Sequence, residues 1–448
     1  SWGNDWDYPA HRGKRFRRYF EGKAIPQLTE LLTGYGPVGI MWFDCPLTIS
    51  REESGRIVEL VRKLQPDCLI NTRIGHGFGD YGSYGDNQLP AAPPEGMWET
   101  PGTLNRTWGF KWNDHDWKTP GEVLSLLASL AEKDTNYLLN VGPMPDGSFP
   151  PETVRVLRET GKWLERYGFA VYGCGANPFQ CSFDWGYVTV EQRPGKRTRL
   201  HLIIREFRPE IRLYGLEEVV VRCWDAAEPE CPVEFGCSGG RCLTIRLPER
   251  LRARLLPVVT LELACRNAPA VCTDLVPLDH VLRLPAARGT IRHGQREAAV
   301  EPAELRGLGA AGERHPAVSH CCLDRTGNLA EWHNPADRIE WEAYFPEEGR
   351  YRVEVVTVSG IHGAAWKTGQ KVELAVSGDG GAANVLVATL NGRPDPSASD
   401  RCYIRGSAEA GTLSLNGAGR RKISLRMLDC PDREALAMTL AELRLVRL

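Results

Sequence analysis

Residues 38–44 read VGIMWFD, and this stretch decides the fold expected for the first part of the chain. It is short and apolar, it follows the turn pair Gly36-Pro37, and it ends on Asp44. A short apolar run bounded by turn residues is typical of a strand buried on both faces, as in a parallel sheet. A carboxylate at the end of such a strand favours a (β/α)8 barrel, in which the active site lies on the loops that follow the strands.

Strand and helix signals alternate after this stretch. Ser50 and Glu53 form an S-x-x-E capping box, which predicts the start of a helix. The alternation continues with a strand at 67–74, a helix capped at 119–122, a strand at 136–141 and a helix over 151–167. Alternating strands and helices with short connections predict a parallel sheet. About four βα units fit here where a barrel needs eight, so residues 1–180 are predicted to form the C-terminal half of a (β/α)8 catalytic barrel.

The hydrophobic pattern changes to a period of two after residue 180. This pattern predicts that residues 181–264 form a small β-sandwich and that residues 317–448 form a jelly-roll-like β-sandwich module. The segment 265–316 is rich in Ala, Pro, Gly and Arg, and we interpret it as a linker or cover segment. The predicted fold class is α/β plus all-β, a partial (β/α)8 barrel followed by two antiparallel β-sandwich domains.

Three tryptophans of the last module differ in their sequence context. Trp341 alternates in phase with Ile339, so it is predicted to be buried. Packing in the core is the favoured role for these tryptophans, and Trp332 and Trp366, which stand in turn-like contexts, are the candidates for exposed faces that stack on sugars. We expect this module to hold the protein near glycans or near a neighbouring subunit.

Charge and hydropathy argue against two classes of partner. The formal net charge is -2 and the pI is about 6.6, so no basic surface for nucleic acid or an anionic membrane is expected. No run approaches the ~18 consecutive apolar residues of a membrane span. The 14 cysteines are scattered without zinc-finger spacing, which is typical of a reduced intracellular protein, and we expect a cytoplasmic location.

Two carboxylates follow neighbouring predicted strands. Asp86 comes 42 residues after Asp44, in the glycine- and tyrosine-rich loop 79–87. Loops after adjacent barrel strands lie side by side, so both carboxylates are expected to face one cleft. Glycoside hydrolysis uses such a pair, one group to attack the anomeric carbon and one to protonate the leaving oxygen. A strand-end cap at Asp44 and a turn-forming role for Asp86 are the alternatives.

Further polar and aromatic residues stand near the ends of these strands. Arg73 suits the orientation of a carboxylate or the binding of a hydroxyl, with a salt bridge at the barrel rim as the alternative. Trp98 and Glu99 combine an aromatic platform with an acceptor, and a core tryptophan beside a solvated glutamate is the alternative. No group of His, Asp and Glu has metal spacing, so we expect a metal-free mechanism without a cofactor.

Several motifs together resemble one family of glycosidases. They are Tyr35-Gly36-Pro37, Met41-Trp42-Phe43-Asp44, Asn71-Thr72-Arg73, Trp98-Glu99-Thr100, Thr107-Trp108-Gly109-Phe110, 136–143 (NYLLNVGP) and 173–179. The set is collinear over residues 1–260 and resembles the α-L-fucosidases of glycoside hydrolase family 29. The resemblance implies a retaining exo-α-L-fucosidase that hydrolyses terminal L-fucose from a fucosylated oligosaccharide or glycoconjugate through a covalent fucosyl-enzyme intermediate.

The resemblance also implies roles for individual residues. The nucleophile of the family is the Asp of the W-x-D strand end, which corresponds to Asp44. The acid/base position resembles the bacterial branch, in which an Asp within a G-D-N segment acts, and this corresponds to Asp86. The fallback candidates for the acid are Glu95, Glu99 and, more weakly, Asp80. The implied substrate-binding residues are Trp42, Arg73, Trp98 and Glu99.

The chain departs from the family pattern at its beginning. The H-W-G and H-H-D-G segments of the family are absent, and the sequence starts near the stretch of Ser1, Asp5 and Trp6 that follows the third strand in the family. We therefore expect about three barrel strands to lie outside this sequence. Two alternatives stay open, a non-catalytic carbohydrate-binding or scaffold protein derived from a truncated glycosidase and a barrel glycosidase for another sugar. A homo-oligomer is compatible with the sequence.

Overall fold

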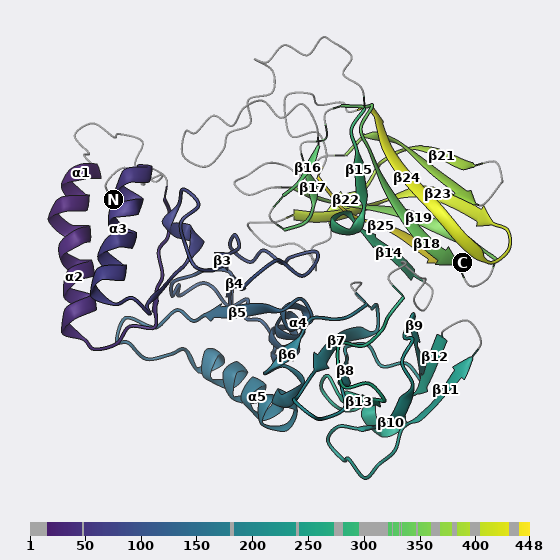
Figure 1. Cartoon of the computed structure of the whole chain (residues 1–448), viewed down its shortest axis with the longest axis horizontal. Helices are drawn as coiled ribbons and strands as arrows, with labels where there is room; N and C mark the ends of the chain where they lie inside the picture. The colour runs from purple at the N-terminus through teal and green to yellow at the C-terminus, as the bar shows by residue number, and fades with distance from the viewer. Residues whose placement is uncertain are drawn as a thin grey trace. The chain divides into compact units, whose positions relative to one another are not determined.

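The computed structural model of the chain describes residues 16–46, 49–179, 183–238, 242–272, 281–294, 321–324, 326–330, 332, 334–345, 348–359, 368–378, 383–394, 404–429 and 439–448. The chain divides into two compact units, and Figure 1 labels their helices and strands. Unit 1 comprises Ser1–Tyr84, Glu95–Glu99 and Val300–Val318, and unit 2 comprises Gly85–Pro94, Thr100–Ala299 and Ser319–Leu448. Ser1, Asp5, Trp6 and Trp366 lie outside the described residues.

Unit 1 combines helices with short parallel strands. Its elements are α1 (Phe16–Tyr19), η1 (Phe20–Ala24), α2 (Ile25–Gly34), β1 (Ile40–Met41), α3 (Arg51–Leu64), β2 (Leu69–Ile70), η2 (Thr72–Ile74) and β3 (Gly82–Ser83). The capping box at Ser50 is formed as predicted, with the Ser50 hydroxyl accepting from the Glu53 backbone. The core of the unit gathers apolar side chains from the helices and from β2, among them Phe20, Leu32, Ile57, Val61 and Ile70.

Strand β1 is shorter and more exposed than the sequence predicted. It pairs in parallel with β2, and Ile40 lies opposite Leu69. These two side chains are 50% and 36% exposed, whereas the apolar run predicted a strand buried on both faces. Among the described residues, β2 is the one strand hydrogen-bonded to β1. The other edge of β1 therefore has no paired strand in this part of the chain.

A second parallel pair in unit 1 joins β3 to the first residues of β4 (Trp98–Thr103). Gly82 lies opposite Trp98, and Ser83 lies opposite Glu99. A β-carbon at position 82 would lie 2.1 Å from the Trp98 ring, so the indole covers a backbone that only glycine leaves open. Because Glu99 is paired with Ser83, strand β3 fixes the backbone position of Glu99 in unit 1.

In unit 2, the end of β4, two helices and the strand between them precede a series of antiparallel sheets. α4 (Pro120–Ala131), β5 (Thr135–Asn140) and α5 (Pro151–Tyr167) fall close to the predicted ranges. One five-stranded sheet follows with the order β10-β13-β8-β7-β6, and a three-stranded sheet has the order β11-β12-β9. Their bounds are β6 (Cys174–Gly175), β7 (Gly186–Glu191), β8 (Arg199–Ile204), β9 (Glu210–Tyr214), β10 (Val220–Asp225), β11 (Glu234–Ser238), β12 (Cys242–Arg246) and β13 (Val258–Leu263).

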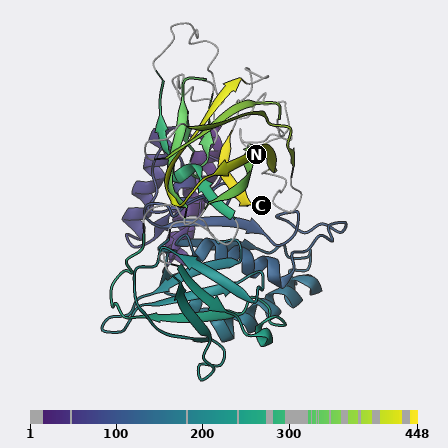
Figure 2. The ribbon, with the colours of Figure 1, turned by 90° about the vertical axis from the view of Figure 1, so that its right-hand side faces the viewer.

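The first sheet packs on the helices that precede it. Leu124 of α4 and Trp163 of α5 share one buried cluster with Tyr187 of β7 and Ile203 of β8. Figure 2 shows the blue helices beside the teal strands of this part of the chain. The small β-domain and the last two helices therefore share buried surface.

The C-terminal β-domain consists of a seven-stranded and a five-stranded sheet. In the first, the order is β16-β17-β25-β19-β23-β22 with β14 also paired to β25, and in the second it is β15-β18-β24-β20-β21. The bounds are β14 (Val281–Pro285), β15 (Thr290–Arg292), β16 (Cys322–Leu323), β17 (Leu329–Ala330), β18 (Arg338–Phe345), β19 (Gly349–Ser359), β20 (Lys371–Gly378), β21 (Asn384–Thr389), β22 (Arg393–Pro394), β23 (Ile404–Leu415), β24 (Gly419–Asp429) and β25 (Leu440–Arg447). Side chains from both sheets share one core.

Two features of this domain differ from the sequence-based expectation. Residues 281–292, which the sequence placed in a linker or cover segment, supply β14 and β15, and these strands pair with β25 and β18. Trp332, a candidate for an exposed sugar-stacking face, is fully buried instead; the core of the domain accommodates it beside the short strand β17. The predicted burial of Trp341 is confirmed, at 2% exposure.

No helix among the described residues is both long and apolar enough to cross a membrane. None of the cysteines in the described ranges takes part in a disulfide bond.

Candidate active site

Asp44 follows β1 and presents its carboxylate to solvent. The side chain is 48% exposed, and its Oδ1 accepts a hydrogen bond of 2.8 Å from Nη1 of Arg73. Arg73 belongs to η2, directly after β2, and is itself 15% exposed. Its Nη2 donates to the backbone oxygen of Tyr84 at 2.6 Å. One guanidinium thus connects the acid after β1 to the residue that follows β3.

The backbone before Asp44 is held by a residue whose role sequence reasoning missed. Asn71 is fully buried, and its Oδ1 accepts from the Phe43 backbone nitrogen at 2.8 Å. Its Nδ2 donates to the Phe43 backbone oxygen at 2.9 Å. The sequence contained this residue only as part of the Asn71-Thr72-Arg73 motif, which gives no indication that the side chain clamps another strand.

Glu99 and Trp42 form a second pair in unit 1. Nε1 of Trp42 donates to Oε1 of Glu99 at 2.5 Å, and Glu99 is 7% exposed. The guanidinium carbon of Arg73 lies 5.1 Å from the centre of the Trp42 ring, within the range of a cation–π contact. Four of the predicted site residues, Asp44, Arg73, Trp42 and Glu99, are therefore joined by consecutive contacts.

Trp98 has a packing role on the neighbouring strand. Its ring stacks on Tyr84 with centroids 4.4 Å apart, and its Nε1 donates to the backbone oxygen of Glu95 at 3.0 Å. Since Tyr84 is also the backbone acceptor of Arg73, Trp98 supports the loop on which that arginine rests.

Asp86 lies in unit 2, in a tight turn of the loop between β3 and β4, and is partly buried. The backbone nitrogen of Gln88 donates to Gly85 O at 3.1 Å, and Gly85 N donates to the side-chain oxygen of Gln88 at 2.9 Å. Asn87 adopts a left-handed conformation with φ of 55°, and its Oδ1 accepts from Thr103 N at 2.9 Å. The backbone on both sides of Asp86 is therefore fixed by hydrogen bonds.

The two other fallback acids have different surroundings. Asp80 pairs with Arg62, and its Oδ2 accepts from the Ile70 backbone nitrogen at 2.7 Å, so the carboxylate braces the strand β2. Glu95 is exposed, and its backbone oxygen supports Trp98.

An aromatic loop follows β4 in unit 2. Trp112 is 77% exposed and meets Phe110 edge-on, with ring centroids 4.9 Å apart. Trp108 is 38% exposed, and its backbone oxygen accepts from Nδ2 of Asn140 at 2.7 Å. Exposed indole rings suit stacking on the apolar faces of sugars. The sequence contained Trp108 within a motif but gave no signal for the exposure of Trp112.

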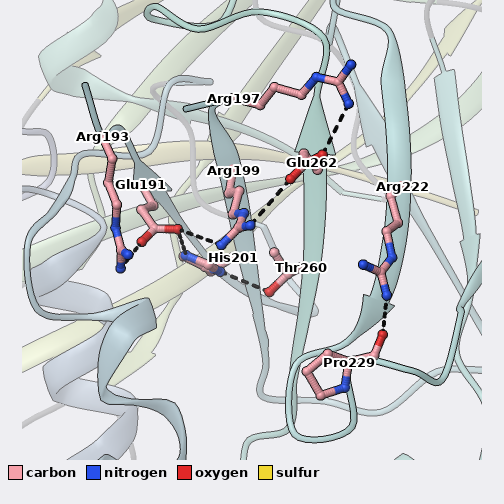
Figure 3. Close-up of polar contacts among 9 residues, drawn as sticks. All are labelled: Glu191, Arg193, Arg197, Arg199, His201, Arg222, Pro229, Thr260 and Glu262. Atoms are coloured by element: carbon pink, nitrogen blue, oxygen red, sulfur yellow. Dashed lines mark hydrogen bonds and ion pairs between the residues drawn. The ribbon is translucent and has the colours of Figure 1, made fainter. Parts of the chain in front are cut away.

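A buried polar cluster on β7, β8 and β13 has the residue types of a hydrolytic triad (Figure 3). Nδ1 of His201 lies 3.0 Å from the Thr260 hydroxyl, and its Nε2 lies 3.6 Å from Oε2 of Glu191. Thr260 is fully buried and His201 is 1% exposed, so a substrate cannot reach the hydroxyl. Burial lowers the pKa of His201, which keeps the ring neutral inside the sheet. This cluster is structural.

Metal-ligand spacing occurs in one place within the described ranges, at His293, Cys321 and Asp337 in the C-terminal β-domain.

Comparison with known proteins gives a consistent result for the first part of the chain. Residues 2–169 match the family model for α-L-fucosidase. The chain is 27% identical over 187 residues to the tissue α-L-fucosidase of Mus musculus, which covers 38% of this chain and 41% of that protein. It is 31% identical over 187 residues to an α-L-fucosidase of Branchiostoma floridae. That alignment covers 38% of this chain and 41% of that protein. The chain thus spans about two fifths of the length of these relatives.

Solved structures extend the similarity in fold. The α-L-fucosidase from Vibrio sp. strain EJY3 aligns with a TM-score of 0.73 at 21% identity, over 99% of this chain and 72% of that chain. α-L-Fucosidase isoenzyme 1 from Paenibacillus thiaminolyticus aligns with a TM-score of 0.51 at 29% identity. This alignment covers 57% of this chain and 65% of that chain. The mixed α/β region and the following antiparallel sheets therefore share the fold of a fucosidase. In sequence, residues 2–169 of this chain are therefore similar to the α-L-fucosidase family, and in fold almost the whole chain is similar to a solved α-L-fucosidase.

Proposed function

We propose that the protein containing this chain is a retaining exo-α-L-fucosidase whose nucleophile is Asp44. The observation that carries the proposal is the half-exposed Asp44 carboxylate, which follows a parallel strand and is oriented by Arg73 inside the segment that matches the family. The substrate is a terminal L-fucose on an oligosaccharide or glycoconjugate.

In the proposed mechanism, Asp44 attacks the anomeric carbon while the bond to the leaving oxygen breaks. Arg73 engages Oδ1 of Asp44, and we assign Oδ2 to the attack. The product of this step is a covalent fucosyl-enzyme, reached through a transition state with oxocarbenium character. Water then cleaves the ester with a second inversion, so the configuration of the fucose is retained.

We assign Asp86 as the acid and base. It would protonate the departing glycosidic oxygen and then remove a proton from the incoming water. The braced turn from Gly85 to Gln88 supports this assignment, because a fixed backbone reduces the cost of positioning the carboxyl group. Retention calls for a separation of about 5–5.5 Å between the two carboxyl groups.

Glu99 is assigned to support of the site. Its carboxylate is buried and engaged by Trp42, whose ring lies against Arg73. An acid that must exchange protons with the leaving group and with water has to be reachable by both.

We further propose that β1 and β2 are part of a (β/α)8 barrel, and that additional strands cover the exposed side chains of Ile40 and Leu69.

The test is the stereochemistry and sugar specificity of hydrolysis. The protein is incubated with 4-nitrophenyl glycosides of α-L-fucose, β-D-galactose, β-D-glucose and α-L-rhamnose, and the first-formed sugar is followed by proton NMR. We expect turnover of the fucoside alone, with α-L-fucose appearing before its β anomer. Initial release of β-L-fucose would overturn the retaining mechanism, and preference for another glycoside would overturn the substrate.

A further inference from the structure

Three side chains of different chemistry converge at one end of the C-terminal β-domain. They are an imidazole, a thiol and a carboxylate, from His293, Cys321 and Asp337. Their potential ligand atoms all lie within 4.8 Å of one another. His293 and Cys321 are 28 residues apart, and Cys321 and Asp337 are 16 apart, so the fold and not the local sequence brings them together.

The pairing of β15 with β18 places the first and last of these residues opposite each other. The two strands are antiparallel, and Arg292 lies opposite Arg338. His293 and Asp337 are the next residues along this register. A β-carbon at position 294 would lie 2.1 Å from that of Ala336, so Gly294 permits the close approach of the two backbones.

The carboxylate and the thiol are held in place before any ion binds. Oδ1 of Asp337 accepts from Gly294 N at 2.9 Å, and its Oδ2 accepts from Cys321 N at 3.0 Å. Asp337 and Cys321 are fully buried. His293 is exposed, and its Nε2 lies 3.0 Å from the backbone oxygen of Cys321. Two ligands are thus preorganised, and the third approaches from the surface.

The donor set selects the kind of ion. Nitrogen, sulfur and oxygen donors together match the preferences of zinc, whereas magnesium and calcium take oxygen ligands. Tetrahedral zinc with bonds of about 2.0–2.3 Å places its ligand atoms roughly 3.3–3.7 Å apart. Since the ligand atoms lie within 4.8 Å of one another, the widest separation has to shorten by about 1 Å when zinc binds.

We propose that His293, Cys321 and Asp337 bind one zinc ion, with water as the fourth ligand. Cys321 binds as the thiolate and releases its proton to solvent. The role of the site is structural, because its ligands come from both sheets of the domain. His293 and Asp337 adjoin β15 and β18 of the five-stranded sheet, whereas Cys321 directly precedes β16 of the seven-stranded sheet. The ion would tie the two sheets together and close the connection between His293 and Cys321, which are 28 positions apart in sequence, and this stabilises the folded state.

The test compares the whole chain with single-residue variants after removal of metal by a chelator. Zinc content after reloading is measured by mass spectrometry, and cobalt(II) is titrated while the absorption spectrum is recorded. Cys321→Ser and His293→Ala are the test variants, and Cys322→Ser is the matched control, since Cys322 is the adjacent exposed cysteine. Thermal unfolding with and without zinc provides a readout that does not depend on activity.

We expect the wild type and Cys322→Ser to hold one equivalent of zinc more than either test variant. Both should show a thiolate-to-cobalt charge-transfer band, and this band should be lost in Cys321→Ser. Zinc should raise the Tm of the wild type and of the control only. Equal zinc content in the wild type and His293→Ala would overturn the proposal even where Cys321→Ser does not fold, because His293 is at the surface. A charge-transfer band that Cys322→Ser removes would also overturn it.

Discussion

Asp44 and Glu99 carry the same functional group but meet different partners. The Asp44 carboxylate is half exposed and oriented by an arginine, whereas the Glu99 carboxylate is buried and accepts a hydrogen bond from an indole. An exposed, oriented carboxylate suits attack on a substrate. A buried one that already has a donor suits the support of Trp42. The two environments fit the nucleophile assigned to Asp44 and argue against Glu99, a fallback candidate for the acid, as a group that exchanges protons with substrate and water.

The division of roles predicts how two variants respond to the leaving group. Asp86→Ala should slow hydrolysis of fucosides with poor leaving groups by about 10²–10⁴-fold, and dinitrophenyl fucoside much less, because a good leaving group needs little protonation. Glu99→Gln keeps an acceptor for Trp42, so its loss should not depend on the leaving group. The measurement is a plot of log kcat/KM against leaving-group pKa, with Glu95→Gln as the exposed control. A steep dependence in Glu99→Gln and none in Asp86→Ala would reverse the assignment.

At the scale of elements, the end of β1 depends on the strand next to it. Asn71 follows β2 and makes two hydrogen bonds to the backbone of Phe43. The position of Asp44 therefore depends on the side-chain amide of Asn71, which does not have to contact the substrate.

Replacement of Asn71 should reduce activity through the position of the nucleophile. Asn71→Ala leaves both backbone groups of Phe43 without their partner, which costs about 1–3 kcal/mol in free energy of unfolding. A displacement of about 1 Å at Asp44 should lower kcat by roughly 10²-fold. Urea unfolding and kcat are measured together, with Asn136→Ala on the exposed side of β5 as the control. An unchanged kcat in a destabilised Asn71→Ala would show that the clamp serves stability alone.

The elements were predictable to different degrees. The capping boxes at Ser50 and Thr119 located α3 and α4, because such caps depend on residues three apart in sequence. The strand at 38–44 shortened to β1, since strand length depends on pairing with distant chain. The clamp by Asn71 and the cluster around Cys321 were not predictable, because both join residues whose proximity only the fold creates. Trp332 became a candidate for exposure because its turn-like context carried no sign of the core that it enters.

At the scale of the whole molecule, buried glutamates stabilise the C-terminal β-domain. Burial alone would raise the pKa of Glu442, but Arg283, Arg444 and Arg405 outweigh this and lower the pKa to about 2. Glu340 has the same arrangement: burial raises its pKa, and hydrogen bonds from Arg338, Lys422 and Arg292 lower it to about 2. The two carboxylates come from different sheets of the domain.

These shifts predict a loss of stability in acid. The pKa of each glutamate is lower in the folded state than its ordinary value of 4.5, so the stabilisation is complete above that pH and is lost as the pH falls toward about 2. Glu442→Gln should therefore be much less stable than the wild type at pH 7, and the difference in Tm should shrink between pH 5 and pH 3. Glu409→Gln, on the exposed side of β23, is the control. A difference in Tm that is constant over this range would contradict the charge argument.

The attack by Asp44 is the central claim, and capture of the covalent intermediate tests it most directly. A 2-deoxy-2-fluoro-fucosyl fluoride pairs a good leaving group with a slowed second step, so the fucosyl-enzyme accumulates. The protein is then digested, and the labelled peptide is identified by mass spectrometry. We predict one fluorofucosyl group on Asp44, and no label in Asp44→Asn. A label on Asp86 or Glu99, or full labelling of Asp44→Asn, would contradict the account.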